Sequence, residues 1–192
     1  MKFYLSIFLS LFIYNFSIAQ YCTSDSRFTE KKYFSISQID STLDLSYGNA
    51  LNWQNSNEDL KLDIYYPSLN HDNLTKRPFI LLIHGGSFLF GDKADWRLLC
   101  REFAKRGFVV ATINYRLGYG SNDANGLNKA IYRAQQDANA SLRYIVENKD
   151  LYKIDTSAIL IGGGSAGAFT ALNVQYLSEQ EWNITTTGIS ST

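Results

Sequence analysis

Two glycine-rich segments carry the residues that could do chemistry. Residues 163–167 read G-G-S-A-G, a G-x-S-x-G pattern centred on Ser165. In this pattern the serine stands on a sharp strand-to-helix turn, where glycines two residues before and two after it avoid side-chain clashes. A hydroxyl presented there can attack an acyl carbon to form an ester intermediate, and the helix that follows offers N–H groups to the developing negative charge. The pattern therefore predicts Ser165 as a nucleophile.

The second segment, His84-Gly85-Gly86, lies about 80 residues upstream. Its glycines would let backbone N–H groups approach an oxyanion without interference from a Cβ atom. Serine hydrolases of this plan take one oxyanion donor from such a loop and the other from the residue after the nucleophile. We therefore expect Gly85 or Gly86, together with Ala166, to form an oxyanion hole. His84 is expected to shape this loop rather than to act as the catalytic base.

The glycines around Ser165 admit two other interpretations. Gly162, Gly164 and Gly167 also satisfy G-x-G-x-x-G, the dinucleotide-binding fingerprint. That fingerprint expects an acidic residue about 20 positions further on, and residues 182–187 contain none. The remaining alternative is a purely structural glycine turn.

The elements that must position these segments can be read from hydrophobic patterning. Continuous apolar runs, typical of strands covered on both faces, predict buried strands at 78–83, 108–113 and 158–161. Periodic apolar or small residues predict helices at 96–105 and 127–146, and a third helix from the G-x-S-x-G turn to about residue 177. Strands alternating with helices indicate an α/β fold around a mainly parallel sheet, whose ligand sites lie at the carboxyl ends of the strands.

The flanking segments and several polar side chains have structural interpretations. Residues 41–47 and 60–66 are the further strand candidates, and His71 in the polar loop 68–76 is expected at the surface. Arg133 and Asp137 lie four residues apart and are expected to form an ion pair on the flank of the long helix. Arg116 is expected to fix a loop near the site, and Phe88 either lines an acyl pocket or packs.

Taken in order, the motifs resemble the α/β-hydrolase superfamily, most closely its secreted bacterial carboxylesterase and lipase-like branch. They are H-G-G-S-F at 84–88, G-D-K at 91–93, N-Y-R-L-G at 114–118, Q-D-A-x-A at 136–140 and the G-x-S-x-G pattern. The resemblance covers roughly residues 60–177 and implies an α/β-hydrolase fold, a mainly parallel eight-stranded sheet with helices on both faces. It also implies ester hydrolysis of a small-molecule substrate without a cofactor. Many relatives have an acidic residue where this chain has Gly164.

The rest of a catalytic triad is absent from this sequence. In this fold an acid and then a histidine follow the serine along the chain, but no histidine follows Ser165. Glu179 and Glu181 come directly after the predicted helix and do not match the acid position. We therefore expect residues 20–192 to be the N-terminal portion of a hydrolase domain, truncated after the helix that follows Ser165. We expect it to be marginally stable and inactive alone, with strand 158–161 as a bare edge.

The first segment predicts export from the cytoplasm. Lys2 precedes an uncharged apolar stretch at 3–18, and Ser17-Ile18-Ala19 fits a signal-peptidase site, so residues 1–19 are read as a signal peptide. The protein is then secreted or periplasmic, without a stable membrane anchor. In an oxidising compartment Cys22 and Cys100 could form a disulfide, and the alternative is two free thiols.

Composition removes several classes of function. Lys plus Arg and Asp plus Glu both number 18, without a basic block, which excludes the electrostatic footprint of a nucleic-acid binder. Two cysteines and the distant His71 and His84 lack the spacing of a metal site. The leading hypothesis is a secreted carboxylic-ester hydrolase, and a noncatalytic binding module on a degenerate hydrolase fold is the rival. Peptidase activity on the same fold is not separated from esterase activity by these residues.

Overall fold

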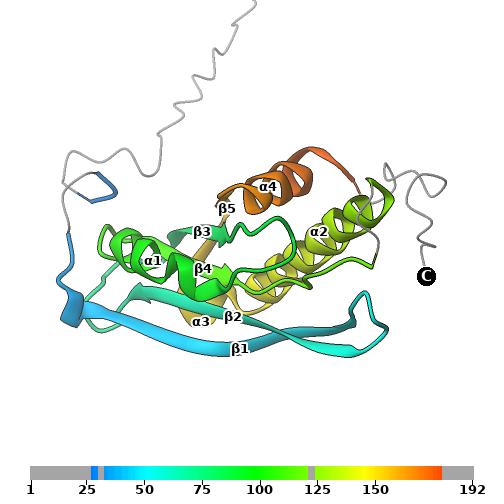
Figure 1. Cartoon of the computed structure of the whole chain (residues 1–192). Helices are drawn as coiled ribbons and strands as arrows, with labels where there is room; N and C mark the ends of the chain where they lie inside the picture. The colour runs from blue at the N-terminus through cyan, green and yellow to red at the C-terminus, as the bar shows by residue number, and fades with distance from the viewer. Residues whose placement is uncertain (1–26, 30–32, 121–123, 179–192) are drawn as a thin grey trace, which may run out of the picture.

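The computed structural model describes residues 27–29, 33–120 and 124–178, which form one mixed sheet and its covering helices (Figure 1). The sheet has five strands in the order β1-β2-β4-β3-β5. Their bounds are β1 (Ile39–Leu51), β2 (Asn57–Pro67), β3 (Arg77–Ile83), β4 (Val109–Ile113) and β5 (Ile154–Gly163). All five predicted strands are therefore present.

The strands with uninterrupted apolar sequences are the parallel ones, as predicted. β3 pairs in parallel with β4 on one side and with β5 on the other, and every residue of β3 and β4 is buried. β1 and β2 form a long antiparallel hairpin, and β2 also runs antiparallel to β4. Within the described residues β5 is an edge of the sheet, and Leu160 on it is half exposed. Ile83 is level with Gly163, so the loops after β3 and β5 leave the sheet side by side.

Alternate side chains of the central strands enter two different cores, because successive residues of a strand point to opposite faces. On one face, Phe79, Leu81 and Ile83 pack beneath α2 (Ala124–Glu147) and α4 (Ala166–Tyr176). On the other face, Ile80 and Leu82 pack with Cys100 and Ala104 of α1 (Arg97–Ala104). Helices thus cover both faces of the sheet.

Three short elements were not predicted: η1 (Ile36–Gln38), η2 (Lys93–Trp96) and α3 (Lys149–Tyr152). The predicted helix 96–105 is replaced by η2 followed by α1, because Asp92 caps the chain earlier by accepting a hydrogen bond from the Ala94 N–H. Helix α2 begins three residues before the predicted range 127–146 and ends one residue after it. Ala130, Ala134 and Ala138 face the sheet, whereas Leu127 is 37% exposed, since small side chains allow the helix to approach closely.

Three of the sequence predictions involve residues outside the described ranges. The signal peptide at residues 1–19, Cys22, and the acidic residues Glu179 and Glu181 all lie there. Cys100 is fully buried and has no disulfide partner among the described residues, and burial raises the pKa of its thiol to about 12. The pairing of Cys22 with Cys100 therefore stays a prediction. Across residues 27–29, 33–120 and 124–178 no helix combines the length and apolar character needed to span a membrane.

Candidate active site

Ser165 occupies a strained turn between β5 and α4. Its backbone has φ 51° and ψ −119°, a left-handed conformation that few non-glycine residues adopt. The Ser165 carbonyl accepts hydrogen bonds from the N–H groups of Ala168 and Phe169 in the first turn of α4. The side chain is exposed, and its hydroxyl does not cap the helix. The hydroxyl is therefore presented above the carboxyl end of the sheet.

The flanking glycines are required by close backbone approach. A Cβ atom built on Gly167 would overlap the Ile83 carbonyl oxygen and stand 2.6 Å from the His84 carbonyl oxygen. A Cβ atom on Gly163 would stand 2.5 Å from the Ile83 oxygen and 2.6 Å from the Gly167 carbonyl carbon. Gly162 lies inside β5, where a Cβ atom would meet only Leu82 at 3.7 Å. The sharp turn therefore begins after Gly162, which disfavours the dinucleotide fingerprint.

The loop at residues 84–88 lies directly against Ser165. A Cβ atom on Gly85 would stand 3.3 Å from the Ser165 Cβ and 2.9 Å from the Gly164 carbonyl oxygen. Among the described residues, the amide N–H groups of Gly85, Gly86 and Ala166 donate no backbone hydrogen bond. The structure thus brings the four predicted site residues together and leaves amide donors unused beside the serine. Their catalytic roles stay predictions.

Loop 84–88 holds an unusual backbone conformation. Gly86, Ser87 and Phe88 all have positive φ angles, of 108°, 53° and 61°. The Phe88 side chain is only 4% exposed and packs in the core with α2 and α4, so it does not line an open acyl pocket. Burial of this ring holds the two non-glycine residues in the left-handed region.

His84 is placed as a loop-shaping residue and not as a base for Ser165. Its imidazole is fully buried, with Nδ1 2.7 Å from the Gly85 carbonyl oxygen, so Nδ1 carries the proton and donates. Burial lowers the pKa of His84, and the hydrogen bond to Gly85 offsets this only in part. His71 lies in the loop before β3, at the amino end of the parallel strands, whereas Ser165 follows the carboxyl end of β5. Neither histidine is therefore arranged to deprotonate the serine.

The predicted ion pair between Arg133 and Asp137 is wrong. Asp137 is buried and pairs with Arg116, whose Nη2 lies 2.7 Å from Oδ1 and whose backbone N–H donates to Oδ2 at 2.8 Å. Arg133 turns away and donates to the Gly118 carbonyl oxygen. The i, i+4 spacing did not predict the partner, because Arg116 in the loop after β4 pairs with the carboxylate instead. Arg116 does fix that loop, as predicted, since it also donates to the Leu51 carbonyl oxygen.

The G-D-K segment at 91–93 joins loop 84–88 to the sheet. Asn114 donates to Asp92 and accepts a hydrogen bond from the Lys93 N–H. The Lys93 ammonium group is buried between Asp63 on β2 and Asp44 on β1. Burial of Lys93 opposes its charge, but the hydrogen bonds that the ammonium group donates to these two carboxylates outweigh this effect and raise the lysine pKa. The charge is therefore used structurally.

Trp96 is a site neighbour that sequence reasoning missed. A Cβ atom on Gly164 would stand 3.2 Å from the Trp96 Cζ2 atom, so the indole occupies the space next to Gly164. The pairing joins residues about 70 positions apart. No sequence periodicity links them, and the sequence indicated Trp96 only as the first residue of the predicted helix 96–105.

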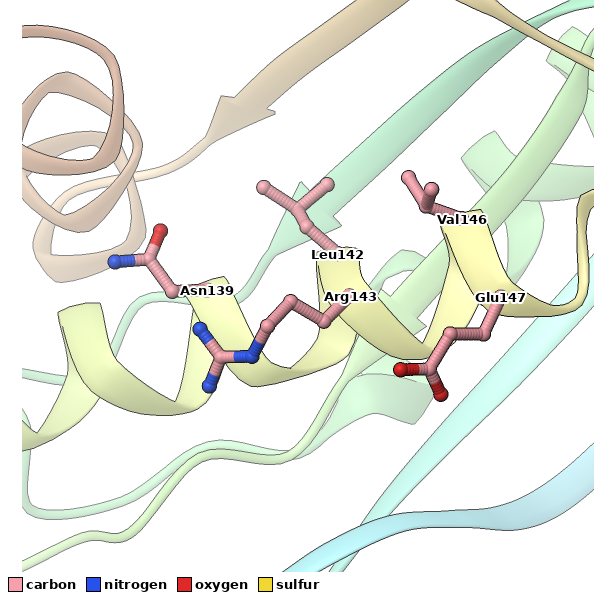
Figure 2. A pocket seen from close by; sticks show the side chains of 5 residues that line it. All are labelled: Asn139, Leu142, Arg143, Val146 and Glu147. Carbon is pink, nitrogen blue, oxygen red and sulfur yellow. The ribbon is translucent and has the colours of Figure 1, made fainter.

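A separate hollow of about 380 Å³ lies along α2 and is lined by Asn139, Leu142, Arg143, Val146 and Glu147 (Figure 2). Figure 2 shows Leu142 and Val146 pointing to one side of the helix, away from Arg143 and Glu147. None of the predicted site residues lines this hollow, so it is distinct from the site at Ser165. Within the described ranges, no three His, Cys, Asp or Glu side chains cluster to hold a metal ion.

Comparisons with known proteins find a matching family and several relatives. The family model BD-FAE matches residues 62–189. Neuroligin-like protein glit-1 of Caenorhabditis elegans is 32% identical over 109 residues, which cover 57% of this chain and 15% of that protein. Probable isoprenylcysteine alpha-carbonyl methylesterase ICME of Oryza sativa subsp. japonica is 33% identical over 111 residues, covering 58% and 24% of the two chains.

Among solved structures, esterase B from Lactobacillus rhamnosis, determined with a C4-C4 SN3 tributyrin phosphonate, aligns with a TM-score of 0.56 and 26% identity. The alignment covers 80% of this chain and 45% of that one. This chain therefore spans less than half of the matched structure and about a quarter or less of the two curated relatives.

Proposed function

Because the chain belongs to the BD-FAE family, an α/β-hydrolase family, we propose that it is part of a serine carboxylesterase. The fold expected from the sequence is confirmed, since the mainly parallel sheet and its helices match esterase structures of the α/β-hydrolase class. Esterase relatives in sequence and in structure support hydrolysis of ester bonds in general. The serine mechanism, the substrate and the secreted location are proposals.

The close approach of Gly85 to Ser165 carries the mechanistic proposal. In it, the Ser165 Oγ attacks the acyl carbon of an ester, and the former carbonyl oxygen becomes an oxyanion. The unused N–H groups of Gly85 or Gly86 and of Ala166 donate to that oxygen, which preorganised donors stabilise without reorganisation. The alcohol leaves with a proton, and water then hydrolyses the acyl-serine to release the acid.

The proton from Ser165 needs an acceptor that the described residues do not supply. Because this chain spans under half of the matched esterase structure, we propose that the acid and the histidine belong to further sequence of a longer hydrolase. The substrate is proposed to be a small uncharged ester, since the chain has no net charge to steer ionic substrates. The apolar stretch at 3–18 supports secretion as the location.

The test compares the 192-residue chain with the same chain extended by its downstream coding sequence. We expect the extended protein to hydrolyse p-nitrophenyl butyrate and to react with a fluorophosphonate probe on the peptide containing Ser165. Ser165→Ala should abolish both, whereas Ser56→Ala, at an exposed serine of the β1–β2 turn, should leave both unchanged. Turnover retained by Ser165→Ala would overturn the mechanism.

The rival function, a noncatalytic binding module, is favoured by the absence of a base near the Ser165 hydroxyl among the described residues. An in-frame stop directly after Thr192, with a folded chain that neither turns over the ester nor reacts with the probe, would support it. Steady ester turnover by the 192-residue chain alone would contradict our proposal that the acid and the histidine lie in further sequence.

A further inference from the structure

We propose that Tyr115 is a positioning residue that holds loop 84–88 so that its amide N–H groups face Ser165. This inference rests on the proposed function, because it assigns to Tyr115 the preorganisation of the oxyanion donors. Tyr115 follows β4 in the N-Y-R-L-G segment, and its side chain is 1% exposed. Among the described residues its side chain contacts loop 84–88, so it acts on the nucleophile through the loop.

Tyr115 contacts His84, the first residue of the loop, in two ways. Its hydroxyl donates to the His84 carbonyl oxygen at 3.0 Å and lies 3.4 Å from the Gly85 carbonyl oxygen. Its ring stacks on the His84 imidazole, with centroids 4.4 Å apart and planes 18° apart. The His84 and Gly85 carbonyl oxygens belong to the two peptide units that carry the Gly85 and Gly86 N–H groups. Fixing these oxygens therefore orients those N–H groups.

The same N-Y-R-L-G segment also contacts Phe88, at the other end of the loop. The edge of the Phe88 ring meets Tyr115 with centroids 6.2 Å apart, and the Gly118 N–H donates to the Phe88 carbonyl oxygen at 2.7 Å. Loop 84–88, with its three consecutive positive φ angles, is thus held at both ends by one short segment. Burial raises the pKa of Tyr115, so its hydroxyl remains a donor throughout the physiological range.

The experiment uses Tyr115→Phe, which removes the hydroxyl and keeps the ring, in the extended esterase. We expect kcat to fall about tenfold or more with KM changed less than twofold, because misplaced oxyanion donors act on the transition state and not on substrate binding. Tyr152→Phe is the matched control, since Tyr152 is another buried tyrosine and its hydroxyl is bonded to Thr42, outside this loop. It should leave kcat unchanged.

A second measurement, which needs no turnover, is hydrogen–deuterium exchange of the 192-residue chain. Tyr115→Phe should raise exchange in peptides covering 84–92 while β3 remains protected, and Tyr152→Phe should not. Unchanged exchange in 84–92 overturns the role of Tyr115, as does unchanged kcat in an enzyme that Ser165→Ala inactivates. If Ser165→Ala retains turnover, the proposed mechanism fails, and the exchange result still decides whether Tyr115 orders the loop.

Discussion

Arg116 and Asp137 form a buried ion pair that joins the loop after β4 to helix α2, with guanidinium Nη2 2.7 Å from carboxylate Oδ1. Their side chains are 9% and 2% exposed. The carboxylate also accepts the Arg116 backbone N–H, which fixes the chain where it leaves the sheet. Since Tyr115 precedes Arg116 directly, this pair anchors the segment that holds loop 84–88.

Removing one partner should destabilise the fold strongly, because the other charge is left buried without compensation. We expect Asp137→Ala to lower the free energy of unfolding by about 3–5 kcal/mol. Urea denaturation followed by tryptophan fluorescence measures the change. Asp150→Ala on α3, at an exposed carboxylate, is the control and should change stability by less than about 0.5 kcal/mol. Equal effects of the two variants would contradict the structural role of the pair.

Two neighbouring glycines should respond differently to the same added methyl group. Gly167→Ala places a Cβ atom on the Ile83 carbonyl oxygen and should lower the free energy of unfolding by about 2 kcal/mol or more. Gly162→Ala meets only Leu82 at ordinary contact distance and should stay within about 0.5 kcal/mol of the wild type. Thermal melts of both variants check this, and a destabilised Gly162→Ala with an intact Gly167→Ala would refute the described turn.

His84 should make stability fall as the pH falls from about 7 to 5. Burial lowers its pKa in the folded chain, so the unfolded chain binds the proton more readily. Stability therefore rises with pH up to the unfolded value of about 6.5 and is lost below it. Unfolding free energies measured across this range should show a smaller slope in His84→Gln. An unchanged slope in His84→Gln would contradict this prediction.

The parts of the fold that could be predicted from sequence are those set by local pattern. The uninterrupted apolar run of β3 was placed within one residue, because burial on both faces demands it. β1 extends from Ile39 to Leu51, well past the predicted 41–47, because pairing with β2 continues the strand where the apolar pattern stops. The glycines around Ser165 were recognisable for a similar reason, since a close backbone approach admits few other residues.

The parts that could not be predicted depend on contacts between distant segments. Asp137 pairs with Arg116, 21 residues away, and not with Arg133 on its own helix. No spacing rule predicts this pairing. The hydrogen bond from Tyr115 to the His84 carbonyl oxygen joins residues 31 positions apart, and no sequence periodicity predicts it. The N-Y-R-L-G motif marked the segment, but only the structure shows which of its side chains faces loop 84–88.

The pairing of β3 with β5 also sets the order of events during folding. Gly85 and Ser165 are about 80 residues apart in sequence, and they meet only when the last strand inserts beside β3. Contacts this distant require a large loop to close before any stabilisation is gained, which slows folding. During synthesis the ribosome releases loop 84–88 well before the serine emerges. Loop 84–88 and its aromatic contacts can therefore form before Ser165 is synthesised, and the site is complete only once β5 has paired with β3.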